Sequence, residues 1–258
     1  MSEPLQAQLP KLPSVYRLVA LDCVDSTNDE ARRLAEAGAE DGTLVWALEQ
    51  RKGRGRQGRS FDSPRGNLFL SLVLRPECSV AEAPQLGFVA AAAVREAVGS
   101  LAHPVMEVRY KWPNDVLFNG RKGAGILLES LLGAGGGLDW LVLGVGVNVA
   151  SHPEGLEPPA TSLHFEGAPT DLGAAELLEA FARYFLNLTS RWLDEGFQPI
   201  RRSWLRHVQG LGEEIRVRLP GETVAGLFED LDETGALVLR LPDGGRRLIT
   251  AGDVGFGA

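Results

Sequence analysis

The apolar residues of the chain fall into two patterns, short runs of β-forming residues and longer stretches with helical spacing. Short runs bounded by turn residues are typical of strands, and amphipathic stretches of ten or more residues are typical of helices. The segments that the first pattern predicts as strands are 16–21, 43–49, 67–74, 105–112, 116–119, 123–132 and 138–149. The segments that the second pattern predicts as helices are 26–38, 83–98, 172–193 and 199–208.

Turn and capping residues support these boundaries. Asn119-Gly120 and the glycine cluster 133–137 each separate two strand-like runs, which predicts successive hairpins. Ser26 or Thr27 precedes the first helical segment, with an acidic residue three positions later, and Gly38 follows that segment. These are the residue types that begin and end helices.

The character of the chain changes near Gly210. The short strand-like runs that follow are 215–219, 223–231, 237–241 and 246–250. Several short strands separated by turn residues indicate a small β-barrel. We therefore expect an α+β fold, with a mixed β-sheet flanked by helices over residues 15–208, a small C-terminal barrel over residues 209–258 and a flexible N-terminus over residues 1–14.

Composition and charge exclude several classes of protein. The chain has 258 residues and a net charge of −8, which argues against a protein that coats nucleic acid. No apolar run approaches the length of a membrane span, and the N-terminus lacks the basic and apolar regions of a secretory signal. The two cysteines, Cys23 and Cys78, are far apart in the sequence, and no histidine lies near either of them. We therefore expect a cytoplasmic protein without disulfides or a zinc site.

One segment contrasts with this acidic background, because five cationic residues lie between Arg51 and Arg59. Its centre, Gly53-Arg54-Gly55-Arg56-Gln57-Gly58, matches the GxGxxG pattern of dinucleotide-binding folds, but residues 59–66 cannot form the helix that such a fold requires. Arginine forks and glycine backbone favour an anion, so we expect the loop to close over a phosphorylated ligand. The alternative is a solvated basic loop or a nucleic-acid contact.

Three further segments carry candidate chemistry. Lys111-Trp112-Pro113-Asn114-Asp115 places a cation and a carboxylate at the end of a strand, which suits Mg²⁺ or a substrate hydroxyl, although a turn aspartate is the alternative. The segments 121–127 and 144–148 contain glycines within strand-like runs, where a ligand can approach the backbone closely. A tight hairpin and a β-bulge are the respective alternatives.

In this order and spacing, the motifs resemble those of the biotin–protein ligase family. The resemblance rests on Ser26-Thr27-Asn28, Glu49-Gln50, and the segments 53–59, 111–115, 122–127 and 144–148. Residues 225–226, 231–232, 235–237 and 251–254 are similar to the family's small C-terminal domain. The resemblance covers nearly the whole chain, and it implies a catalytic domain like those of class II synthetases and biotin or lipoate ligases, followed by an SH3-like barrel.

The resemblance also implies an activity: activation of biotin with ATP and Mg²⁺, and transfer to a lysine of a biotin carboxyl carrier protein, without a tightly bound prosthetic group. The residues implied in biotin binding are Ser26, Thr27, Asn28, Gln50, Gly53, Arg54, Gly55, Arg56, Lys122, Gly125 and Gly144. Those implied in ATP binding are Arg56, Arg59, Phe61, Lys111, Asn114, Asp115 and Asn148. Those implied in catalysis are Arg56, Lys111, Asp115 and Lys122, with Asp115 also helping to place Mg²⁺.

Two features depart from the family's pattern. Phe61 stands where members commonly have a tryptophan that faces the adenine. Residues 1–14 are proline-rich and are all that precedes the first predicted strand, so we expect a ligase without the DNA-binding repressor domain of some members. The family further implies a homodimer with neither a nucleic-acid nor a membrane partner.

Three other functions stay open as alternatives. A lipoate–protein ligase shares the fold and the adenylation chemistry, although the arginine–glycine loop favours biotin. A nucleic-acid-binding module that uses residues 51–59 is disfavoured by the acidic charge and by the lack of interleaved aromatic residues. A paralogue that only binds biotin is disfavoured because Lys111, Asp115 and Lys122 are all present.

Overall fold

The computed structural model describes residues 9–102, 106–133 and 135–256. The larger part of the chain is built on a seven-stranded mixed sheet with the strand order β1-β2-β3-β7-β6-β5-β4. The strands are β1 (Arg17–Leu21), β2 (Thr43–Ala47), β3 (Leu68–Leu74), β4 (Val108–Lys111), β5 (Asp115–Phe118), β6 (Arg121–Leu132) and β7 (Leu138–Val147). The β1–β2 pair is parallel, and the other pairs of neighbouring strands are antiparallel.

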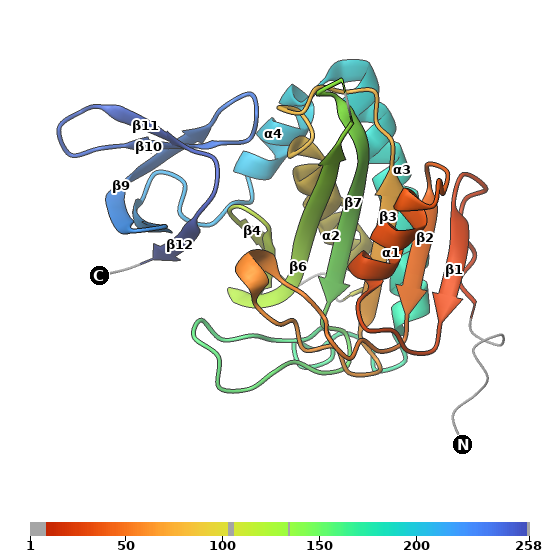
Figure 1. Ribbon diagram of the computed structural model, residues 1–258. Coiled ribbons are helices and arrows are strands. Elements are labelled where there is room, and N and C mark those ends of the chain that lie inside the picture. The colour runs from red at the N-terminus through yellow and green to blue at the C-terminus, as the bar shows by residue number, and fades with distance from the viewer. Residues whose placement is uncertain (1–8, 103–105, 134, 257–258) are drawn as a thin grey trace.

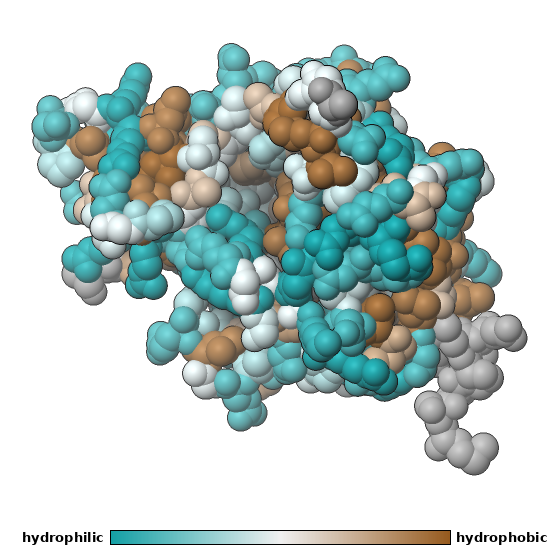
Figure 2. Space-filling view, viewed as in Figure 1, coloured by the Kyte–Doolittle hydropathy of each residue, from teal (hydrophilic) through white to brown (hydrophobic). Residues whose placement is uncertain are grey.

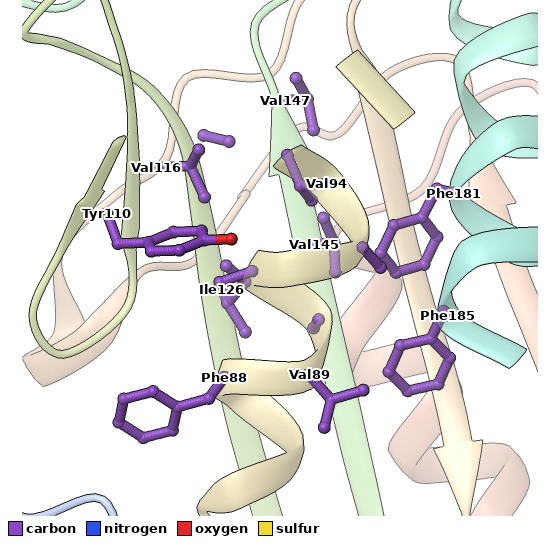
Figure 3. Packing of buried hydrophobic residues seen from close by; sticks show 14 of the residues in the cluster. Phe88, Val89, Val94, Tyr110, Val116, Ile126, Val145, Val147, Phe181 and Phe185 are labelled. Carbon is purple, nitrogen blue, oxygen red and sulfur yellow. The ribbon is translucent and has the colours of Figure 1, made fainter. Parts of the chain in front are cut away.

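Two long helices cover one face of this sheet. Helices α2 (Gln85–Leu101) and α3 (Ala174–Glu195) lie there side by side (Figure 1). Successive residues of a strand point to opposite faces, so Ile126, Val145 and Val147 all point towards α2 and form the main core with it (Figure 3). Helix α2 is apolar over most of its surface, as expected for a helix buried between a sheet and another helix.

The opposite face of the sheet is covered only in part. Helix α1 (Thr27–Glu36) packs Ala31 and Ala35 against valines of β2, β3 and β7. Beyond the N-terminus of α1, β3 carries Ser71 and β7 carries Gly144 and Gly146 on this face. This region of the sheet, between α1 and the C-terminal part of the chain, is where the predicted motifs meet.

After α4 (Gln198–Leu205) the chain forms an antiparallel five-stranded sheet with the order β11-β10-β9-β8-β12. Its strands are β8 (Glu214–Leu219), β9 (Glu222–Leu231), β10 (Leu237–Arg240), β11 (Arg246–Ile249) and β12 (Asp253–Phe256). The expectation of four strands is wrong, because β12 was missed. Its four residues include a glycine and lack a strand-like pattern, and they become a strand by pairing with β8.

The small sheet is fixed to the larger part by hydrogen bonds that bury polar groups. Trp112 Nε1 donates to the carbonyl oxygen of Gly235 at 3.1 Å, and Gln85 Nε2 donates to that of Glu233 at 2.9 Å. Arg201 Nε on α4 donates to the carbonyl oxygen of Leu231 at 2.7 Å. These contacts fix the small sheet against the larger part, and Asp253 of β12 pairs with Arg59 of the basic loop.

The α+β fold with a small C-terminal β-domain is confirmed. The predicted elements occur with shifted ends; α2, for example, begins at Gln85 instead of residue 83 and ends at Leu101 instead of residue 98. The Asn119-Gly120 hairpin is confirmed, and both residues have positive φ, 48° and 78°. Residues 1–8 of the predicted N-terminus, residue 105 of the predicted strand 105–112 and residue 134 of the glycine cluster lie outside the described residues. Within the described ranges, no helix is long and apolar enough to cross a membrane.

Candidate active site

Three glycines form the floor of a slot on the α1 side of the sheet. Gly125 of β6 pairs with Gly146 of β7, and Gly144 of β7 pairs with Leu127 of β6. A Cβ atom added to Gly146 would lie 2.7 Å from the Phe61 ring, and one added to Gly144 would collide with the side-chain oxygen of Asn28. The three glycines point to one face of the sheet, where the side chains of Asn28, Phe61 and Lys122 approach the backbone closely.

A buried polar network closes one end of the slot. The Thr27 amide and hydroxyl both donate to Gln50 Oε1, at 2.8 and 2.9 Å, and Gln50 Nε2 donates to Ser63 Oγ at 2.9 Å. Ser71 Oγ on β3 lies 2.8 Å from Thr27 Oγ1 and 2.6 Å from Asn28 Oδ1. This end therefore offers donors and acceptors to a neutral polar group.

The start of α1 explains why these residues meet. Ser26 is the N-cap, and its hydroxyl accepts from the backbone N–H of Asp29 at 3.4 Å. The capped first turn directs Thr27 and Asn28 down onto β3 and β7. Gln50 is brought alongside by a bridge between its backbone and that of Val24.

The basic loop is a closed hairpin over the slot. Phe61 N donates to Gly53 O at 2.9 Å, Gly55 N donates to Arg59 O at 2.7 Å, and a 3₁₀ turn, η2 (Arg56–Gly58), forms its tip. Figure 2 shows hydrophilic residues gathered on this side of the molecule, between the C-terminal sheet and α1. The loop returns to the sheet at Phe61, whose ring packs edge-on against Phe69 and rests on Gly146 and Gly125.

Cationic side chains gather at the other end of the slot. Lys122 Nζ lies 2.7 Å from Asp115 Oδ1 and close to the position that a Gly125 Cβ would occupy. Lys111 stands opposite Asp115 in the β4–β5 register. Arg56 Nη1 reaches across from the loop and donates to Asn114 Oδ1 at 3.3 Å. The arrangement concentrates positive charge where an anion would meet the slot.

The C-terminal part of the chain supplies partners for Arg56, Arg59 and Lys111. Arg56 Nη1 also donates to the Gly252 carbonyl oxygen at 3.3 Å, and Arg59 forms an ion pair with Asp253. The Lys111 ammonium lies 5.5 Å from the centre of the Phe256 ring, a cation–π contact. Strand β12 is thus part of this end of the site.

Asn148 stands just beyond β7 with one polar atom unused. Its Nδ2 donates to the carbonyl oxygen of Thr161 at 2.9 Å, and its backbone N donates to that of Gly123 at 2.8 Å. Its Oδ1 is buried and has no hydrogen-bond partner among the described residues. A buried acceptor without a partner is costly unless a ligand supplies a donor.

The comparisons with known proteins agree with this geometry. Residues 58–206 match the model of the biotin/lipoate A/B protein ligase family, and residues 210–257 match the biotin protein ligase C-terminal domain. A biotin–[acetyl-CoA-carboxylase] ligase from Paracoccus denitrificans is 43% identical, and the alignment covers 90% of this chain and 98% of the relative. The chain belongs to the biotin protein ligase family.

Other relatives support the assignment. The bifunctional ligase/repressor BirA of Bacillus subtilis is 33% identical, with 91% of this chain and 72% of the relative covered. The structure of the Aquifex aeolicus biotin protein ligase in complex with biotin and ATP is similar with a TM-score of 0.78 at 30% identity, and 93% of this chain and 97% of that one are covered.

Most of the residues that the family resemblance implied lie at one of the two ends of the slot. Thr27, Asn28 and Gln50 form the polar end, and the residues at the cationic end are Arg56, Arg59, Lys111, Asn114, Asp115 and Lys122. Gly53 has no room for a side chain beside Ser63. Gly55 differs, because an added Cβ would meet only Arg59, at 3.5 Å or more, so its surroundings do not require glycine.

Sequence reasoning missed several residues of the site. Ser71 and Glu129 lie in the polar end, and Gly252, Asp253 and Phe256 lie in the cationic end. Ser71 carried a signal, because it is the one polar residue in the otherwise apolar run 68–74. Gly252 and Asp253 lie in the segment 251–254 that resembles the family's C-terminal domain, but nothing in the sequence connected these two residues or Phe256 with the site.

Burial shifts the ionisation of two cations. Burial lowers the pKa of Lys111; Lys122 and Arg59 lower it further, whereas Asp115 and Asp253 oppose the shift. Burial also lowers the pKa of Arg56, although arginine stays charged at any working pH. Lys111 therefore loses its proton at a lower pH than an exposed lysine does.

This shift predicts the alkaline pH dependence of nucleotide use. As pH rises through the lowered pKa of Lys111, the site loses a positive charge, and kcat/KM for ATP should fall. In Lys111→Arg the charge persists, so the fall should move to higher pH. The measurement is kcat/KM for ATP from about pH 7 to about pH 10.5. If kcat/KM for ATP fell over the same alkaline pH range in the wild type and in Lys111→Arg, the fall would come from the titration of another group.

Proposed function

We propose that the protein activates biotin with ATP to biotinyl-5′-AMP and transfers the biotinyl group to a lysine of a biotin carboxyl carrier protein. The observation that carries the proposal is the slot itself, which has a neutral polar network at one end and a cation cluster at the other. Biotin has the matching form, a ureido head and a carboxylate joined by an apolar chain. Glycines 125, 144 and 146 put no side chain of their own on this face of the sheet, where Phe61, Asn28 and Lys122 surround them.

The polar end supports biotin over lipoate. Thr27, Asn28 and Ser71 are buried polar residues and Gln50 is half-buried, and a ureido group both donates and accepts hydrogen bonds. The dithiolane ring of lipoate would leave these groups without new partners. Sites built to hydrogen-bond a substrate reject analogues that lack the polar group by about 10⁴- to 10⁵-fold at best.

The cationic end supports adenylation. A carboxylate oxygen of biotin attacks the α-phosphorus of ATP and forms a new P–O bond, while the bond from the α-phosphorus to the oxygen bridging it to the β-phosphate breaks and pyrophosphate leaves with its electrons. Both reactants are anionic, so Lys122, Arg56 and Lys111 reduce their repulsion and stabilise the charge that develops on the phosphate oxygens. The loop over the slot limits access of water to the mixed anhydride that results.

The second step needs an amine in place of water. The nitrogen of the carrier lysine attacks the biotinyl carbonyl carbon, an amide bond forms, the bond to the phosphate oxygen breaks, and AMP leaves. The ammonium group loses its protons to water or buffer in the process. The acceptor implied by the family is the biotin carboxyl carrier protein of a carboxylase.

The nucleotide fits the residues beside the cation cluster. We assign the phosphates to Arg56, Arg59 and Lys111. The buried, unpartnered Oδ1 of Asn148 suits an exocyclic amine such as that of adenine. The Phe61 ring lies against Gly125 and Gly146, and we assign it to the adenine side of the site, as the family resemblance implies.

We expect Mg²⁺ to bind together with the nucleotide and not at a permanent metal site of the protein. Among the described residues, no group of three or more His, Cys, Asp or Glu side chains could hold a metal ion. Mg²⁺ is commonly held by one or two carboxylates together with substrate phosphates, and Asp115 is placed to be such a carboxylate. When bound, Mg²⁺ neutralises phosphate charge.

The remaining partners follow the family. We expect a homodimer in the cytoplasm, without nucleic acid. The arginines of the loop argue against the nucleic-acid alternative, because Arg54, Arg56 and Arg59 each contact a group within the protein instead of forming an open basic face.

The test is ATP–pyrophosphate exchange by the purified protein with Mg²⁺, with biotin or lipoate added in parallel, in the wild type and in Arg56→Ala. We expect exchange that depends on biotin and falls by about 10²-fold or more in the variant. Exchange supported by lipoate instead would assign the protein to the lipoate branch. Absence of exchange with either acid would contradict the adenylation chemistry.

A further inference from the structure

Glu129 is a carboxylate at the polar end of the slot that the proposed chemistry does not use. It lies on β6 opposite Val142, two residue pairs beyond the Leu127–Gly144 pair. Its side chain is 25% exposed, and it points to the same face as the slot glycines because residues 125, 127 and 129 alternate with core positions. An acidic residue in this place needs partners.

One partner is Asn28. Asn28 Nδ2 donates to Glu129 Oε2 at 2.8 Å, while Asn28 Oδ1 lies 2.6 Å from Ser71 Oγ. A carboxylate accepts hydrogen bonds, so only the NH₂ end of the amide can face it. Glu129 thereby fixes which end of the Asn28 amide points to Ser71 and to the rest of the polar network.

The other partner is the basic loop. Arg54 Nη2 lies 2.6 and 2.9 Å from the two oxygens of Glu129 and 3.0 Å from Asp29 Oδ1 on α1. The first half of the loop is therefore fastened to the sheet at the polar end. Its second half is fastened separately, to the C-terminal sheet through Arg59 and Asp253.

We infer that Glu129 is a positioning residue for biotin: it orients the Asn28 amide and holds Arg54 and the first half of the loop over the ureido end. Its contacts lie with Asn28 and Arg54, away from the cation cluster. It should therefore govern the affinity for biotin with little influence on ATP. The inference rests on the proposed function and adds a residue that acts through the groups around the ligand.

Two substitutions separate its two roles. Glu129→Ala removes both the acceptor for Asn28 and the charge for Arg54. Glu129→Gln keeps an oxygen that can accept from Asn28 but removes the charge. Glu229→Gln is the matched control, because Glu229 forms a similar two-bond pair with Arg246, at 2.7 and 2.8 Å, in the C-terminal sheet.

The experiment measures the biotin dissociation constant by calorimetry, and KM for biotin and ATP and kcat by pyrophosphate exchange. Loss of a hydrogen-bonded charge should raise the Kd and KM for biotin by about 10-fold or more in Glu129→Ala, and by about 3-fold in Glu129→Gln. KM for ATP should stay within about 2-fold of wild type in both variants, and Glu229→Gln should match wild type, because neither set of contacts reaches the cation cluster.

The possible results distinguish a failure of the role of Glu129 from a failure of the proposed function. An active wild type with an unchanged biotin Kd in Glu129→Ala would overturn the positioning role alone. Equal rises in the KM for biotin and for ATP in both variants would also overturn it, since they would indicate general disruption. A wild type that neither binds biotin nor supports exchange would overturn the proposed function, and the inference with it.

Discussion

Replacing Lys122 by glutamine is expected to slow biotin-dependent pyrophosphate exchange by about 10²-fold or more, the usual effect of losing one preorganised charge at a developing oxyanion. Lys122 lies beside Gly125 at the junction of the slot and the cation cluster, where the carboxylate and the α-phosphate must meet. Glutamine keeps most of the length of the side chain and removes its charge. The effect should therefore fall on kcat more than on stability.

Two measurements test whether Lys122 acts in the chemistry: the free energy of unfolding of Lys122→Gln, and the activity of a control variant at another lysine. Lys122 and Asp115 are partly exposed, so their pairing should contribute only about 0–1 kcal/mol to the free energy of unfolding. Lys52→Gln is the control, because Lys52 also lies in the basic segment but is exposed and paired with Asp25 at 2.8 Å. Similar losses of activity in both variants, or near-normal exchange in Lys122→Gln, would remove Lys122 from the chemistry.

Replacing Gly144 by alanine is expected to abolish measurable biotin binding at ordinary ligand concentrations. The new methyl group would overlap the Asn28 side chain, which cannot move freely because Ser71 and Glu129 hold both ends of its amide. The same methyl group would occupy the floor of the slot. Overpacking of this kind typically costs about 1–3 kcal/mol of stability, so the protein should still fold.

Calorimetry with biotin and thermal unfolding measure the two effects of Gly144→Ala. Gly99→Ala is the control, because Gly99 lies in α2 with no atom near the position of an added Cβ. A helical Gly-to-Ala change should be neutral or stabilise by about 0.5–1 kcal/mol. Biotin affinity within a few-fold of wild type in Gly144→Ala would mean that the ligand does not lie over this strand pair.

The fold was largely accessible from local patterns. The apolar run 138–149 and the helical stretch 172–193 have strong periodicity, and both became the expected elements. Their ends moved by a few residues because capping and pairing, and not propensity, decide where an element stops. Strand β12 was missed because its pairing with β8 is a contact between segments distant in the chain, and the sequence of β12 has no period to reveal it.

The site residues were predicted from motifs, and a motif can identify only residues that lie close together in the sequence. Glycines within β6 and β7 were recognised as sites of close approach, and the structure pairs Gly125 with Gly146. Glu129 was passed over because a single acidic residue in a strand near a hairpin is usually solvated. Its contacts with Asn28 and Arg54 span 101 and 75 residues, and no local pattern encodes such distances.

The direction of the slot has a consequence for which acids fit it. The slot runs along β6 and β7. Its two ends are therefore separated by the distance along these strands from the Gly125–Gly146 pair to Gly144. Gly144 lies two residues along β7 from Gly146, which corresponds to about 6.8 Å of strand. The next position on β7 that faces the slot is Val142, which lies under α1. The strands therefore fix the spacing between Asn28 beside Gly144 and Lys122 beside Gly125, and we expect an acid with a longer chain between head and carboxylate to bind more weakly.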